Sequence, residues 1–142
     1  MNTLAHNTEL IRPILPNLVL AWLWIVLGFG FGALMGMRFQ DENWLGGYGS
    51  FPRRLYRLGH IAFFGLAIIN LLFFFTVCLI GRPRDNWALS AWGFGIGAIT
   101  MPLSCLLMAH WPRARPLFVF AVPVASLLLA GLTTLWKVLN LL

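Results

Sequence analysis

The chain has 142 residues, of which 60% are hydrophobic and only 10% are charged, and its mean hydropathy is +0.82. Soluble domains carry about 25% charged residues, so this composition excludes a typical soluble protein and predicts one membrane domain over residues 1–142. The formal net charge of +6 does not indicate nucleic-acid binding, because the sequence leaves no room for a basic domain. Loop arginines in contact with lipid headgroups explain this charge better.

Four apolar stretches fill most of the chain. They lie at about residues 16–38, 55–80, 87–110 and 116–139. Each is as long as the roughly 20 residues that a helix needs to cross a bilayer, and none contains an acidic residue. The sequence therefore predicts an all-α integral membrane protein, an antiparallel bundle of four transmembrane helices. It disfavours proton-coupled transport by a carboxylate within the membrane.

The first stretch carries glycines at every fourth position. Gly28, Gly32 and Gly36 share one side of a helix, and Gly93 and Gly97 of the third stretch have the same spacing. Such small-residue faces let helix backbones approach closely in a membrane. We therefore expect these glycines to be helix-packing positions.

A six-residue sequence recurs in the first and third stretches. Residues 28–33 read Gly-Phe-Gly-Phe-Gly-Ala and residues 93–98 read Gly-Phe-Gly-Ile-Gly-Ala, so five of six positions match. An aromatic-Pro-Arg turn then leads into the next stretch, at residues 51–53 and 111–113. These echoes favour the hypothesis of two pseudo-repeated helical hairpins. The alternative is convergence, because glycine is common in membrane helices.

Four spans place both termini on one side of the membrane and the loops at residues 39–54 and 111–115 on the other. The loop side carries six basic residues and the terminal side four. The six are Arg38, Arg53, Arg54, Arg57, Arg113 and Arg115, and the four are Arg12, Arg82, Arg84 and Lys137. Because cytoplasmic loops are enriched in Lys and Arg, we predict cytoplasmic loops and external termini. We expect the membrane to be a bacterial inner membrane.

Two histidines are the main candidates for chemistry. His60 lies near the loop-side end of the second stretch and His110 ends the third, so antiparallel helices bring both imidazoles to a similar depth. A pair of neutral imidazoles can ligate a metal, and a b-type haem between membrane helices also needs arginines near its propionates. We therefore name His60 and His110 as candidate metal and haem b ligands, with Arg57 and Arg113 as candidate propionate partners. The alternatives are hydrogen bonding in the headgroup region and a quinone-headgroup site.

Asn70 lies near the middle of the second stretch. A polar side chain at this depth usually forms a hydrogen bond across helices. We predict a packing role for Asn70, and the alternative is a place on a transport path.

Three functions fit these features. The preferred prediction is a small structural accessory subunit of a larger energy-transducing membrane complex, respiratory or photosynthetic, without catalytic activity of its own. This prediction explains both the small-residue helix faces and the spans without acidic residues. The alternatives are a haem-binding electron-transfer protein and a small dimeric transporter or channel. The expected partners are the lipid bilayer and other membrane subunits, or a second copy of the chain.

Overall fold

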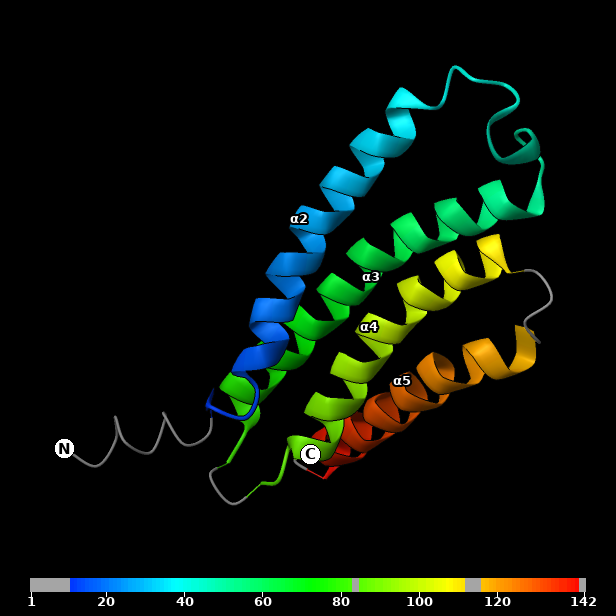
Figure 1. Cartoon of the computed structure of the whole chain (residues 1–142). Helices are drawn as coiled ribbons and strands as arrows, with labels where there is room; N and C mark the ends of the chain where they lie inside the picture. The colour runs from blue at the N-terminus through cyan, green and yellow to red at the C-terminus, as the bar shows by residue number, and fades with distance from the viewer. Residues whose placement is uncertain (1–10, 83–84, 112–115, 141–142) are drawn as a thin grey trace.

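The computed structural model of the chain describes residues 11–82, 85–111 and 116–140. The elements are α2 (Leu15–Met37), the short 3-10 helix η1 (Trp44–Gly46), α3 (Phe51–Ile80), α4 (Ala88–His110) and α5 (Pro116–Leu139) (Figure 1). The four α-helices are each long and apolar enough to cross a membrane, and no strand occurs in the described ranges. The predicted all-α membrane bundle is therefore confirmed.

The helix α3 begins at Phe51, earlier than the sequence predicted. Ser50 caps it, because its backbone is extended and its hydroxyl oxygen accepts a hydrogen bond from the backbone N–H of Arg53 at 3.3 Å. Pro52 occupies the first turn, where a missing N–H removes no helical hydrogen bond. The first loop is therefore shorter than the predicted 39–54 and ends at this cap.

The four α-helices are antiparallel, and each packs mainly on its neighbours along the chain (Figure 1). The central pair is α3 and α4, with α2 and α5 on either side. The main apolar cluster lies where α3, α4 and α5 meet, and it includes Phe73, Val77, Trp87, Phe94 and Ala130. By contrast, α2 and α5 leave most of their apolar side chains exposed. In a bilayer these side chains contact lipid or another membrane protein.

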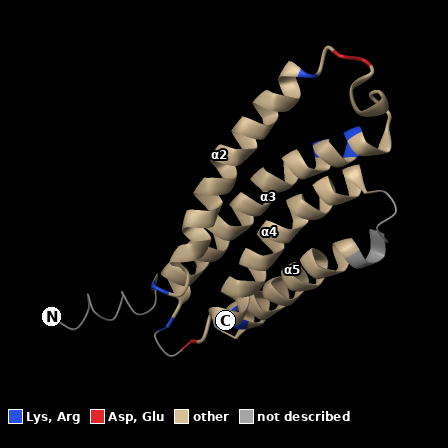
Figure 2. Cartoon of the chain, viewed as in Figure 1, with Lys and Arg blue, Asp and Glu red and all other residues tan. Residues whose placement is uncertain are grey.

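Charged residues gather at the two ends of the bundle (Figure 2). The end with the first loop carries Arg38, Asp41, Glu42, Arg53, Arg54 and Arg57, and the opposite end carries Arg12, Arg82, Asp85 and Lys137. Lys137 reaches outward from the last turn of α5: its ammonium lies 4.4 Å from the centroid of the Trp87 ring, and it donates to the Asn86 carbonyl. This separation of charged ends from an apolar middle is what a membrane-spanning bundle requires.

Glycines of α2 form its close contact with α3. A Cβ at Gly28 would lie 2.9 Å from the tip of the Phe64 ring, and one at Gly32 would lie 2.7 Å from Cε1 of His60. At both glycines, a side chain of α3 therefore lies in the space that a Cβ would need. Gly36 takes no part in this contact, because a Cβ there would meet no atom of the described chain within 4 Å. The reason is geometric: α2 and α3 diverge toward the first loop (Figure 1).

Glycines of α4 form an equivalent contact with α5. A Cβ at Gly93 would lie 2.8 Å from the Cβ of Ala130 and 2.9 Å from the backbone carbonyl oxygen of Ser126. One at Gly97 would collide with the side chain of Leu127. In each hairpin, the glycines of the first helix thus pack on the second helix. This equivalence supports the hypothesis of two related hairpins.

Pro102 interrupts the hydrogen bonds of α4. Proline has no N–H, so the carbonyl four residues earlier, that of Ala98, loses its helical donor. The indole Nε1–H of Trp24 donates to this carbonyl at 2.9 Å. A side chain of α2 thus replaces the missing backbone donor of α4. Helices in a membrane need such a replacement, because the bilayer core holds no water that could form the hydrogen bond.

Pro123 has the same effect in α5, where it leaves the carbonyl of Val119 without a helical donor. The hydroxyl of Ser104 on α4 donates to that carbonyl at 2.9 Å. Each helix-interior proline is therefore paired with a donor from an adjoining helix. These two bonds fix the α2–α4 and α4–α5 contacts.

Candidate functional site

His60 lies between α2 and α3. Its ring stacks with Phe31 at 6.3 Å between centroids and meets Phe64 edge to face at 5.4 Å. Its Cε1 faces Gly32 of α2. Its Nδ1 is buried and has no hydrogen-bond partner among the described residues. His60 is thus enclosed by aromatic rings and a glycine rather than by other metal-binding side chains.

His110 ends α4 and is exposed. Its Nε2 lies 2.8 Å from the hydroxyl of Tyr56, within hydrogen-bond distance, and the two rings meet edge to face at 5.9 Å. Tyr56 also stacks on Phe31 and touches Trp44, with ring centroids 5.7 and 5.6 Å apart. Tyr56 therefore joins α2, η1, α3 and α4 at the loop end of the bundle.

The structure places the two histidines in different contacts. His60 faces α2, whereas the Nε2 of His110 is engaged in a hydrogen bond with the hydroxyl of Tyr56. A haem between them would require Tyr56 to release His110 and the ring of His60 to move away from Gly32. In the part of the chain that the structure describes, no group of three His, Cys, Asp or Glu side chains could hold a metal ion.

Of the two candidate propionate partners, the structure describes Arg57. The guanidinium of Arg57 lies 4.5 Å from the centroid of the Tyr48 ring and donates to the Tyr48 carbonyl at 3.4 Å, so it is engaged by the first loop. Arg113 lies outside the described residues. The haem b prediction therefore gains no further ligand from the described geometry.

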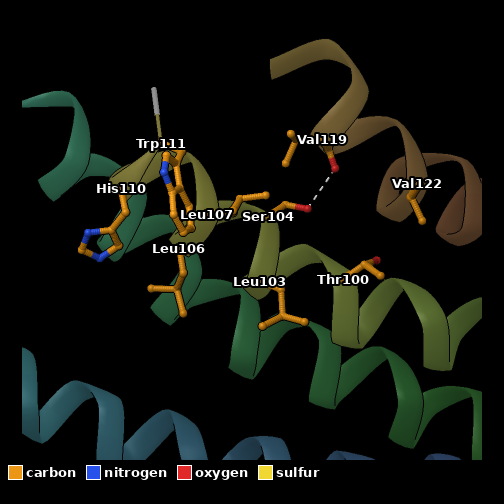
Figure 3. Close-up of a pocket in the computed structure, with 9 residues that line it drawn as sticks. All are labelled: Thr100, Leu103, Ser104, Leu106, Leu107, His110, Trp111, Val119 and Val122. Carbon is orange, nitrogen blue, oxygen red and sulfur yellow. Dashed lines mark hydrogen bonds between the residues drawn. The ribbon is translucent and has the colours of Figure 1, made fainter. Parts of the chain in front are cut away.

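An apolar groove of about 870 Å³ lies between α4 and α5, with His110 among its lining residues (Figure 3). The residues that line it are Thr100, Leu103, Ser104, Leu106, Leu107, His110, Trp111, Val119 and Val122. Figure 3 shows the Ser104 hydroxyl directed at the Val119 carbonyl. Thr100 donates to the Ile96 carbonyl of its own helix. The groove thus suits a lipid chain or an apolar side chain of a partner.

Arg53 organises the first loop, which the sequence did not predict. Its side chain is only 2% exposed, and it donates to the carbonyls of Phe39 at 3.3 Å and of Asp41 at 3.5 Å. Its guanidinium lies 5.3 to 5.4 Å from the ring centroids of Phe39, Trp44 and Tyr48. The positive charge is therefore held by carbonyl oxygens and aromatic faces. This arrangement fixes the loop over the start of α3.

Asn70 is completely buried and takes part in a hydrogen-bond network across three helices. Its amide donates to the Leu66 carbonyl, and its Oδ1 accepts from the amide of Asn17 on α2, both at 2.8 Å. The same Asn17 amide also donates to the Ala91 carbonyl of α4 at 3.0 Å. The predicted packing role of Asn70 thus has a geometric basis.

Asn17 is a second residue whose role the sequence did not predict. It is the only amide side chain in the first apolar stretch, and this was a usable signal, because a lone amide in a membrane helix needs a partner.

Comparisons with protein-family models, with curated proteins and with solved structures found no match to this chain.

Proposed function

We propose that the chain is a small structural accessory subunit of a larger membrane complex, with the energy-transducing complexes as the class expected from the sequence. Its work in this proposal is to pack against other membrane subunits. Catalysis and cofactor binding are assigned to those subunits.

Outward-facing glycines support this proposal most directly. A Cβ at Gly30 on α2 or at Gly65 on α3 would meet no atom of the described chain, and both glycines are exposed. Glycine lowers the stability of a helix by about 1 kcal/mol relative to alanine. At these two positions, no packing contact within the described chain offsets this loss. In membranes, small residues allow a second helix to approach closely. We infer that Gly30 and Gly65 mark contacts with a partner.

The polar groups of the spans support the same reading. Asn70 directs both ends of its amide at neighbouring groups and is 0% exposed, so it does not line an open path. His110 is bonded to Tyr56, and His60 is packed on Gly32. These contacts favour a packing role over a transport path or a bis-histidine haem site.

Affinity purification from native membranes in mild detergent tests the proposal. We expect the full chain to elute with at least one other membrane protein in constant ratio. Gly65→Leu should weaken this association, because a side chain would fill the contact. The chain itself should stay folded, since no atom of the described residues lies within 4 Å of a Cβ at that position. Ile68→Leu, on the same helix at a 56% exposed position, is the matched control.

The proposal fails if the wild-type chain elutes as a stable monomer. It also fails if the chain elutes only with copies of itself, or if Gly65→Leu and Ile68→Leu retain the same partners in the same ratio.

We further propose that the chain lies in a bacterial inner membrane with the loop end in the cytoplasm and both termini outside. The excess of basic residues at the loop end supports this orientation. Alkaline phosphatase, which is active only outside the cytoplasm, should be active when fused after Leu142 and inactive when inserted at Gly49. The opposite pattern would reverse the orientation.

A further inference from the structure

The two hairpins share a repeated six-residue sequence but bury it differently. In the second hairpin, Phe94 packs on Phe73 of α3 with 5.2 Å between ring centroids, and Ala98 follows one turn later on the same side of α4. Phe94 is 7% exposed and Ala98 is fully buried. Their counterparts in the first hairpin, Phe29 and Ala33, are both exposed, Phe29 to 68%. The same residue types are thus covered in one hairpin and uncovered in the other.

The glycines of the repeated sequence show that these positions correspond. Gly28 and Gly93 each lie against the second helix of their own hairpin, and a Cβ at Gly30 or Gly95 would meet no atom of the described residues within 4 Å. Contacts within a hairpin are therefore equivalent at these glycines. The difference arises between hairpins, because α4 receives α3 on its Phe94 side, whereas the corresponding side of α2 faces out of the bundle.

The helix α5 shows the same difference when it is compared with α3. Phe64 of α3 and Ala130 of α5 lie against corresponding glycines of α2 and α4, so the two helices match at these residues. Two positions later, Leu66 is 5% exposed, on the side of α3 that carries Phe73, whereas Leu132 of α5 is 63% exposed. The row of helices thus ends in two uncovered sides, one on α2 and one on α5 (Figure 1). Within the chain, the corresponding sides of α4 and α3 pack together.

We propose that copies of this chain associate head to tail in the membrane, so that the outer side of α5 in one copy covers the outer side of α2 in the next. This contact repeats between copies the packing of α3 on α4 within one copy. It joins two different surfaces, so each copy binds two neighbours. The assembly therefore grows into a ring or a filament rather than stopping at a symmetric pair.

The topology permits this contact without turning a copy over. Neighbouring helices alternate in direction, so α2 and α5 of one chain run antiparallel, as α3 and α4 do (Figure 1). When α5 packs antiparallel on the α2 of the next copy, both copies keep the same orientation in the membrane. Copies of one sequence insert in the same orientation, because their charged ends are the same.

Hydrogen bonds between the helices set which residues lie at the same depth. Asn17 and Trp24 of α2 each donate to a carbonyl 74 positions later, in α4. Ser104 of α4 in turn donates to the Val119 carbonyl of the antiparallel α5. By these two registers, Phe29 of α2 lies level with residue 120 of α5.

The two outer sides fit each other at equal depth. Next to residue 120, α5 presents the small, exposed Ala121, which leaves room for the ring of Phe29. Two turns nearer the termini, Trp22 and Leu128 lie level within one residue, and both are exposed. The repeated sequence lies roughly two and a half turns deeper in α2 than in α4. The pairing between copies therefore follows from depth and not from position in the repeat.

Head-to-tail association goes beyond the proposed function and does not depend on it. Gly30, next to Phe29, would contact the second copy, while the side of α3 around Gly65 stays free for another subunit. A chain that binds only to other copies of itself would support head-to-tail association and contradict the proposed function. The two proposals can therefore fail separately.

Cysteine crosslinking in native membranes tests the proposal, with the exposed Cys78 replaced by serine in every chain. Phe29→Cys and Ala121→Cys are placed in two differently tagged full-length copies that are expressed together. Both positions are exposed, so the fold should tolerate these changes. We expect oxidation with copper phenanthroline to give a disulfide-linked pair that carries both tags. Leu132→Cys in place of Ala121→Cys is the matched control, because it is exposed on the same side of α5 but lies about 16 Å further along the helix, beyond disulfide reach.

With Phe29→Cys and Ala121→Cys in one chain, we expect a ladder of products beyond the dimer, because each copy links to two neighbours. The proposal is overturned if the mixed pair does not form, if the Leu132→Cys control crosslinks as strongly, or if the products stop at a dimer. It is equally overturned if Phe29→Cys alone crosslinks as strongly as the mixed pair, which would show a symmetric contact between two α2 helices.

Discussion

Asn17 and Asn70 are buried amides that bond to each other and to backbone carbonyls rather than to water. The sequence identified Asn70 as a packing residue but gave it no partner. The partner lies 53 residues earlier, and no local pattern links the two positions. The same holds for Arg53, whose contacts depend on how the first loop turns back over α3. Residue types could be predicted from the sequence, whereas their pairings required the fold.

Asn70→Leu should lower the free energy of unfolding by about 1–2 kcal/mol, because the Asn17 amide loses an acceptor in an apolar core. Denaturation in mixed detergent micelles measures this change. In the double variant Asn17→Leu/Asn70→Leu, both partners are removed together. Its cost should be smaller than the sum of the two single costs. Additive costs would show that the two amides are not coupled.

At the scale of the helices, length and composition were sufficient to predict four spans with ends near those observed. The start of α3 was predicted too late, because the prediction used the apolar run alone and did not use the cap at Ser50. The sequence also showed that Pro102 would interrupt its helix, but not which group would replace the lost hydrogen-bond donor. The donor for the freed Ala98 carbonyl comes from α2, and its identity follows from helix packing rather than from spacing.

Trp24→Phe should destabilise the fold by about 1 kcal/mol, because it leaves the Ala98 carbonyl without a donor. The same substitution in a Pro102→Ala background should cost much less, since an alanine at that position restores the helical N–H. Thermal unfolding of the four proteins in detergent forms a complete cycle. An equal cost of Trp24→Phe in both backgrounds would assign its effect to lost packing instead.

Two glycines of α4 make a matched pair for helix packing. Gly93→Ala should cost about 1–3 kcal/mol, because the new Cβ would press on Ala130 and on the Ser126 backbone of α5. Gly95→Ala should be neutral or stabilising by up to about 1 kcal/mol, since its Cβ meets no atom of the described residues within 4 Å and alanine favours the helix. Unfolding in detergent measures both. Equal effects would contradict the close α4–α5 contact at Gly93.

At the scale of the whole molecule, the antiparallel bundle with two charged ends could be predicted from hydropathy and charge. The grouping of His60 and His110 into one site could not be judged from sequence. Spacing gives the depth of a side chain in the membrane, but the direction of each ring depends on which helix lies beside it. In the structure, Gly32 admits His60 to the α2–α3 interface, and Tyr56 reaches His110.

The central claim is that the outward face of α3 around Gly65 contacts another membrane protein. Photo-crosslinking in native membranes tests it most directly, with a photoreactive residue at Ile61, one helical turn from Gly65 and 64% exposed. We predict one discrete protein product that disappears in a Gly65→Leu background. Crosslinking to lipid alone, or a product that is unchanged by Gly65→Leu, would contradict the claim.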